Sequence, residues 1–184
     1  MGSADYLRKS AALIGSLADK NLLPLLNLLA KSRETKVAVW VIGNGGSQAN
    51  ASHLVLHLQE HGIRAHDLLA ESARITALSN DFDYSQVASR TIRALGNSGD
   101  ILVVISGSGD SPNVVLALVE ARRLGMHTCG LLGFSGGQAL DLCLHVVVVT
   151  SEDYGCIEDA HSALIHAIHN HLLTKREEVT TLSS

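Results

Sequence analysis

The sequence predicts an α/β protein, a three-layer α/β/α sandwich in which helices cover both faces of a central parallel sheet. Two observations carry this prediction. Apolar runs of strand length alternate with helical patterns along the chain. Each run is continuously apolar, which is typical of strands that are buried on both faces. With 184 residues, the chain is expected to form one domain with a sizeable core.

Leucines at helical spacing mark the N-terminal part of the chain. Leu7, Leu17, Leu25 and Leu29 belong to an amphipathic pattern between residues 5 and 31. Pro24 is expected to start a second helix or to kink the first. No residue with an evident chemical role occurs here, so we expect helices that pack in a bundle or in a subunit interface.

A strand–turn–helix unit follows, and the rest of the chain is organised around it. Residues 37–42 (VAVWVI) predict a buried strand. Residues 43–46 (GNGG) permit a sharp turn, and Ser47 is expected to be the N-cap of the next helix. Unpaired N–H groups and the positive end of the helix dipole meet at such a turn, which therefore predicts an anion site.

Apolar runs, caps and glycine stops predict the remaining elements. They are a connector or short strand at 63–70, a strand end or turn at 75–78, a helix from about 84 to 95, strands at 100–105, 127–133 and 144–150, a helix from 112 to about 124, and a last helix from about 156 to 175 with a frayed polar tail.

The composition argues against several functional classes. Asp and Glu total 18 against 14 Lys and Arg, and aromatic residues make up 3%, so direct nucleic-acid binding is disfavoured. No apolar run could span a bilayer, and no secretory signal is recognisable. Cys129, Cys143 and Cys156 lack paired or metal-site spacing, which fits reduced thiols in the cytoplasm. The hydrophobic content of 46% suggests subunit contacts.

Two polar loops follow the carboxyl ends of predicted parallel strands. Ligands bind at these ends in open α/β sheets. The first loop lacks the third glycine of the dinucleotide fingerprint, and the chain has no Walker A motif, so no nucleotide cofactor is expected. Ser106, Ser108 and Ser111 in the second loop could hold a phosphate monoester without a lysine. Alternatively, both loops are simply flexible and polar. Asp110 would repel phosphate, so we expect it to cap the following helix and point away.

Histidines form the second candidate site. His53 and His57 are four residues apart on the helix after the glycine turn, so they share a face and could chelate a metal. Glu158 and His166 are eight residues apart, or roughly 12 Å along a helix. They could share one ion only if both side chains lean inward or if Glu158 precedes the regular helix. His169 and His171 are expected to be ordinary surface or core residues.

These motifs together resemble the sugar isomerase (SIS) domain family, and within it the phosphoheptose isomerases. The resemblance covers nearly the whole chain. It rests on five segments in order: GNGGS at 43–47 with a histidine six residues later, ALSNDFDY at 77–84, SGSGDS at 106–111, GFSGGQ at 133–138, and IEDAHSALIH at 157–166.

The resemblance implies a single SIS domain over residues 1–184, flavodoxin- or Rossmann-like, with a helical segment at 1–34, an α/β core at 35–176 and a tail at 177–184. It also implies a homotetramer with the N-terminal helices in the interface and with sites shared between subunits. The family's metal-binding or catalytic positions fall on His53, His57, Glu158 and His166. The substrate-binding positions, with Asp81 on sugar hydroxyls and the serines on phosphate, are Asn44, Gly45, Gly46, Ser47, Asp81, Ser106, Gly107, Ser108 and Ser111.

The chain departs from the family pattern at three places. His57 stands where the family usually has a glutamate, and Glu158 stands where it usually has a glutamine. Gly107 replaces a threonine, and the lead-in to Glu158 also differs. A carboxylate has thus moved from one helix to another. The result could be a site of three histidines and one carboxylate, or three histidine ligands with Glu158 as a free base.

The resemblance therefore implies an aldose–ketose isomerase that converts sedoheptulose 7-phosphate to a heptose 7-phosphate through an enediol. A divalent metal, expected to be zinc, would polarise the carbonyl, and Glu158 or His166, with His57 nearby, would move the proton. The alternatives are a different sugar-phosphate substrate, or a non-catalytic module that binds a sugar phosphate or a protein partner.

Overall fold

Five parallel strands form the central sheet of the computed structural model, which describes residues 2–182 and the side chains of residues 2–175. The strand order is β2-β1-β3-β4-β5. The strands are β1 (Val39–Ile42), β2 (Ala65–Asp67), β3 (Ile101–Ser106), β4 (His127–Gly133) and β5 (His145–Val149). The predicted parallel α/β architecture is confirmed.

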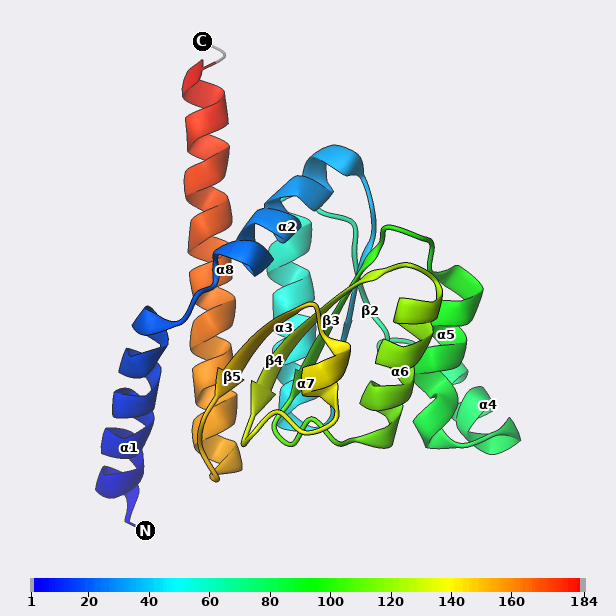
Figure 1. Cartoon of the computed structure of the whole chain (residues 1–184), viewed down its shortest axis with the longest axis horizontal. Coiled ribbons are helices and arrows are strands. Elements are labelled where there is room, and N and C mark those ends of the chain that lie inside the picture. The colour runs from blue at the N-terminus through cyan, green and yellow to red at the C-terminus, as the bar shows by residue number, and fades with distance from the viewer. Residues whose placement is uncertain (1, 183–184) are drawn as a thin grey trace.

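Alternate residues of the strands feed two separate cores. Val39 and Val41 pack with α2 (Leu23–Thr35), α3 (Gly46–Glu60) and α8 (Tyr154–Leu182) on one face of the sheet. Trp40 and Ile42 pack with α5 (Val87–Leu95), α6 (Pro112–Arg123) and α7 (Ala139–Leu142) on the other. Helices therefore cover both faces of the sheet, as Figure 1 shows, which explains why the strand sequences are continuously apolar.

The two N-terminal helices have different positions: α2 packs on the sheet, whereas α1 (Ser3–Gly15) packs on α8. Pro24 lies in the first turn of α2, as predicted, after α1 and the short helix η1 (Ser16–Asp19). Helix α1 lies beside α8, outside the sheet layers (Figure 1). Tyr6 and Ser10 of α1 donate hydrogen bonds of 2.7 and 2.8 Å to Asp159 of α8. These two bonds fasten α1 to the helix that carries the predicted C-terminal site residues.

Three sequence predictions were wrong in detail. Residues 75–78 belong to helix α4 (Ser72–Asp81), and the prediction failed because a run of four residues cannot distinguish a strand from a helix. Helix α3 begins at Gly46 with Gly45 as its N-cap, so Ser47 lies inside the first turn. Helix α8 continues to Leu182, which places residues 177–182 of the expected tail in a helix. Residues 183 and 184 lie outside the described residues. Within the described part of the chain, no helix has the length and apolarity needed to cross a membrane.

Candidate functional site

The glycine turn after β1 is built by its main chain. Gly45 has a φ of 55°, a conformation that favours glycine. A side chain on Gly43 would collide with the carbonyl group of Ser47, so the turn is too tight for a Cβ there. The Gly43 N–H donates to Gln48 Oε1 at 3.1 Å, and the Gln48 amide donates to Asp67 at 2.7 Å. The first turn of α3 is thereby fixed beside the end of β1.

An amide pair joins this turn to the loop after β3. The strand register sets Ile42 of β1 beside Val104 of β3, so both loops leave the same edge of the sheet. Asn44 and Asn113 donate to each other's side-chain oxygens at 2.9 Å, and Tyr84 of the short helix η2 (Tyr84–Gln86) donates to Asn44 at 2.7 Å. Sequence reasoning missed Asn113 and the role of Tyr84, since only the fold brings them to Asn44.

The serine loop is organised by its own hydroxyl groups. Ser106 accepts the N–H of Gly109 at 3.0 Å, and Ser108 accepts that of Asp110 at 3.2 Å. Ser111 is the N-cap residue of α6. The prediction that Asp110 caps α6 was wrong, because its carboxylate accepts the N–H of Gln138 at 2.9 Å and ties this loop to the one after β4.

The ring of Tyr154 explains why residue 107 is a glycine. A Cβ at Gly107 would stand 2.7 Å from ring carbons of Tyr154, at the start of α8. Tyr154 in turn packs edge-on against Phe134, with ring centroids 5.0 Å apart. The aromatic ring therefore occupies the space in which the family's threonine side chain would lie.

Three histidines meet between α3 and α8. The ring centroids of His53 and His57 are 4.5 Å apart, and that of His166 lies 5.0 Å from His53 and 5.7 Å from His57. One ligand atom from each of the three lies within 4.8 Å of the other two, as one metal ion would require. The predicted meeting of His53 and His57 with His166 across two helices is what the geometry shows.

The electrostatics suit a cation at these histidines. Burial, together with the neighbouring His57 and His166, lowers the pKa of His53, so its ring is neutral at pH 7 and has a free lone pair. Nε2 of His57 is buried and has no hydrogen-bond partner among the described residues. Imidazole nitrogens with a free lone pair are donors that zinc and similar ions accept.

Glu158, a residue of α8, lies beside the N-terminal end of α3. Its carboxylate stands against Gly46, where a side chain on that glycine would collide with it. Among the described residues, it is not part of a potential metal-binding group with the three histidines. The eight residues that separate Glu158 from His166 explain this placement. Glu158 thus lies beside the glycine turn, where the N-terminus of α3 favours a negative charge.

The remaining predicted positions have other surroundings. Asp81 is exposed at the end of α4 and accepts a hydrogen bond of 3.0 Å from Asn80. His161, from the closing motif, is fully buried, and burial lowers its pKa to about 4. His169, expected to be ordinary, has its ring centroid 4.2 Å from that of His57. An isolated histidine carries no local signal of such a contact.

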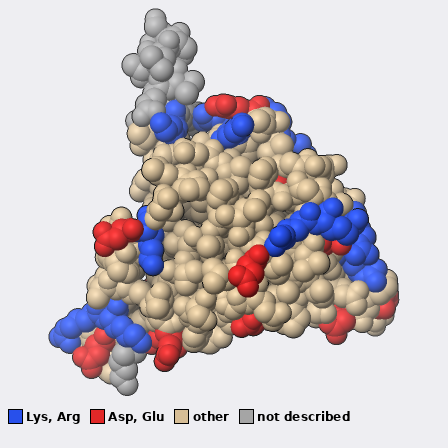
Figure 2. All heavy atoms as spheres, viewed as in Figure 1, with Lys and Arg blue, Asp and Glu red and all other residues tan. Residues whose placement is uncertain are grey.

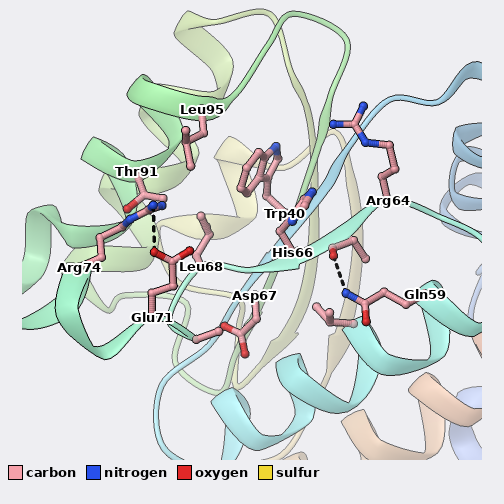
Figure 3. A pocket seen from close by; sticks show the side chains of 13 residues that line it. Trp40, Gln59, Arg64, His66, Asp67, Leu68, Glu71, Arg74, Thr91 and Leu95 are labelled. Carbon is pink, nitrogen blue, oxygen red and sulfur yellow. Dashed lines mark hydrogen bonds and ion pairs between the residues drawn. The ribbon is translucent and has the colours of Figure 1, made fainter.

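A pocket of about 490 Å³ lies on the β2 side of the glycine turn (Figure 3). Trp40 stacks on His66 in its wall, with ring centroids 4.7 Å apart. Asp67, which holds Gln48, also lines it. The pocket contains none of the site histidines or loop serines. The candidate site at the loops and histidines is therefore separate from this pocket.

The chain belongs to the SIS domain family, whose sequence profile matches residues 5–133. It is similar to phosphoheptose isomerases. It is 42% identical to that of Maridesulfovibrio salexigens over 130 residues, which are 67% of this chain and 63% of that protein. It is 34% identical to that of Helicobacter pylori over 172 residues, which are 89% and 90% of the two chains.

Solved structures agree with this placement. The phosphoheptose isomerase GmhA from Neisseria gonorrhoeae superposes with a TM-score of 0.86 at 30% identity, covering 93% of this chain and 96% of that one. A phosphoheptose isomerase from Francisella tularensis gives 0.84 at 31% identity, covering 95% and 100%. The expected family and fold are confirmed.

Proposed function

We propose that this protein is an aldose–ketose isomerase that converts sedoheptulose 7-phosphate to D-glycero-D-manno-heptose 7-phosphate. The names of its relatives, which are phosphoheptose isomerases, supply the substrate class, a phosphorylated heptose. The reaction moves a proton between C1 and C2 through an enediol. It therefore needs an anion site for the phosphate, a base near C1 and C2, and a group that stabilises charge on the oxygens.

One observation carries the proposal: the anion site and the histidine group lie on the same helix, separated along its axis. Ser47 is in the first turn of α3, and His53 is six residues later, about 9 Å along an α-helix. The phosphate and the C1–C2 end are at opposite ends of a seven-carbon sugar phosphate. A substrate with its phosphate on the serine loop after β3 and its C1–C2 end along α3 would thus meet both Glu158, which stands against Gly46, and the histidine group.

The loops take the phosphate in this proposal. The N–H groups at residues 44–47 and the hydroxyls of Ser47, Ser106, Ser108 and Ser111 donate hydrogen bonds to its oxygens, aided by the α3 dipole. Asn44 and Gly107 shape the same wall. Asp81 contacts sugar hydroxyls from α4, which is followed by the η2 segment that holds Asn44 through Tyr84.

His53, His57 and His166 would hold a divalent ion, for which we propose zinc. Such an ion, when bound, supplies a Lewis acid for the carbonyl and hydroxyl oxygens. Glu158 lies outside this histidine group. We therefore assign Glu158 the removal of the carbon-bound proton and His166 the movement of protons at the sugar oxygens.

The test compares Glu158→Gln with Glu152→Gln, which changes an exposed carboxylate ahead of α8. Proton exchange and product formation from ketose phosphates are followed by NMR in D₂O. Glu158→Gln is expected to lower kcat by about 10²–10⁴-fold with little change in substrate binding, and Glu152→Gln to leave both unchanged. Near-normal kcat in Glu158→Gln would show that the base is another residue. Binding without turnover in the parent protein would favour the sugar-phosphate-binding module.

We further propose a cytoplasmic homotetramer with the N-terminal helices in its interface. Large apolar side chains are exposed on α1, on α2 and ahead of β5, at Leu7, Leu23 and Leu144. Figure 2 shows few charged residues over the middle of the face on which Figure 1 shows α7 and β5. Such surface fits contacts between copies. Light scattering coupled to size exclusion tests this, and a monomer at micromolar concentration would contradict it.

A further inference from the structure

The histidines continue beyond the first group, toward the C-terminal end of α3. His57, Glu60 and His169 form a second set whose ligand atoms all lie within 4.8 Å of one another. Nδ1 of His57 is 3.0 Å from Oε2 of Glu60, and the ring of His169 lies 4.2 Å from that of His57. This second set is therefore as closely spaced as the first.

A buried histidine supports the second set from behind. Nε2 of His61 lies 3.2 Å from Nδ1 of His169, and His61 is only 5% exposed. His61 is the C-cap residue of α3, four residues after His57, and both contact His169 of α8. The contact leaves Nε2 of His169 as its remaining ring nitrogen and fixes the orientation of the ring, which is how outer residues commonly position histidine ligands.

We propose that the chain holds a second divalent-cation site beside the first, formed by Glu60 and His169 with His57 shared between the two. Two imidazoles and a carboxylate suit zinc and the neighbouring ions of the first transition row. Glu60 is exposed, so the site opens to solvent and can be filled from outside. The site does not depend on which reaction the protein catalyses.

His57 can serve both groups because its two nitrogens have different surroundings. Nδ1 donates its proton to Glu60, whereas Nε2 is buried and lacks a hydrogen-bond partner among the described residues. With both ions bound, His57 would be shared between them only as an imidazolate, and its Nδ1 proton would pass to solvent. We therefore expect the second ion to bind more weakly than the first and to release this one proton.

The experiment uses the full chain, freed of metal and titrated with Zn²⁺ by calorimetry in two buffers of different ionisation enthalpy. Bound zinc is counted by mass spectrometry after equilibrium dialysis. We expect two ions per chain and proton release with the second. Glu60→Gln and His169→Gln should each keep the first event and weaken the second by at least about 10–100-fold. His127→Gln, at an exposed histidine that starts β4, is the control and should bind two ions.

One zinc per chain in the parent protein would overturn the proposal, as would a second event that survives unchanged in both Glu60→Gln and His169→Gln. Circular dichroism checks the fold of each variant, and the exposed position of Glu60 keeps the test valid if His169→Gln does not fold. The count is independent of turnover. If the protein bound two ions in this manner but had no isomerase activity, the proposed function would be wrong and the second site would still be supported.

Discussion

The two ends of helix α3 are sites of opposite construction. At its N-terminus the main chain forms the proposed anion site, with Gly45 in a left-handed conformation and no room for a Cβ at Gly43. Toward its C-terminus side chains form the proposed cation site, with His53 and His57 facing His166 of α8. The first site depends on local backbone geometry, and the second depends on the packing of two helices far apart in sequence.

This difference predicts different responses to substitution. A main-chain site survives the loss of one side chain, because several N–H groups and hydroxyls share the charge of the ligand. A site of three imidazoles loses a third of its ligands with each substitution. Changes at the histidines should therefore act on kcat and metal content, and changes at single serines should act on substrate affinity.

The largest expected effect separates the two ends directly. His53→Gln removes one histidine ligand and should lower both the zinc content and kcat, the latter by about 10²–10⁴-fold. Ser108→Ala removes one hydroxyl of several and should raise KM by about tenfold with little change in kcat. Steady-state kinetics and metal analysis of both variants make the comparison. Full kcat in metal-free His53→Gln would contradict the assigned role of the cation end.

The fold was largely predictable because buried parallel strands have a local signature. The runs at 37–42, 100–105, 127–133 and 144–150 each match an observed strand to within two residues at either end. The error at 75–78 arose where the run is short and lies in a helix without a fully buried residue. The N-cap error at Ser47 arose because Gly45 already turns the chain one residue ahead of the helix.

The sequence predicted those site residues whose spacing within one helix, or whose place in a family motif, is visible locally. The four-residue spacing of His53 and His57 is visible in the sequence, and the family resemblance added His166. The partners Asn113 and His169 come from distant elements, and no periodicity within α6 or α8 distinguishes them from neighbouring residues. The placement of Glu158 against Gly46 depends on how α8 crosses α3, which a sequence pattern does not encode.

Two glycines of the same turn give the next prediction. A Cβ on Gly43 would meet the main chain of Ser47, so the backbone must shift, and Gly43→Ala should cost about 2–4 kcal/mol of unfolding free energy. A Cβ on Gly46 would meet the movable carboxylate of Glu158. Gly46→Ala should therefore cost less than about 1 kcal/mol, yet lower kcat by displacing Glu158.

Urea unfolding and steady-state kinetics measure both quantities. Gly15→Ala is the control, because a Cβ there would meet nothing within 4 Å, and it should change neither stability nor kcat appreciably. Equal losses of stability in Gly43→Ala and Gly46→Ala would show that the turn is not set by its main chain. Unchanged kcat in stable Gly46→Ala would argue against Glu158 as the base.

The smallest expected effect lies on the opposite face of the sheet, away from both sites. Glu120 of α6 is 5% exposed and pairs with Arg93 and Arg123 at 3.0 and 2.7 Å. Hydrogen bonds from these two guanidinium groups lower its pKa to about 2. Glu120→Gln should cost about 1–2 kcal/mol at pH 7, because both arginines are more than half exposed and water screens the pairs.

The pH dependence of this cost has a definite sign. Since the folded-state pKa of Glu120 lies below its unfolded value of 4.5, the ionised pair stabilises the protein above that value, and the contribution is lost as the pH falls toward about 2. The stability difference between parent and Glu120→Gln, from urea unfolding, should therefore shrink between pH 5 and 3. Glu71 also pairs with an arginine, Arg74, but its side chain is 67% exposed. The stability of Glu71→Gln should therefore differ little from that of the parent at either pH. Isomerase activity near pH 7 should be unchanged in both variants, because neither residue belongs to the proposed anion or cation site. If the stability difference between the parent and Glu120→Gln stayed constant over this pH range, Glu120 would act by packing and not by its charge.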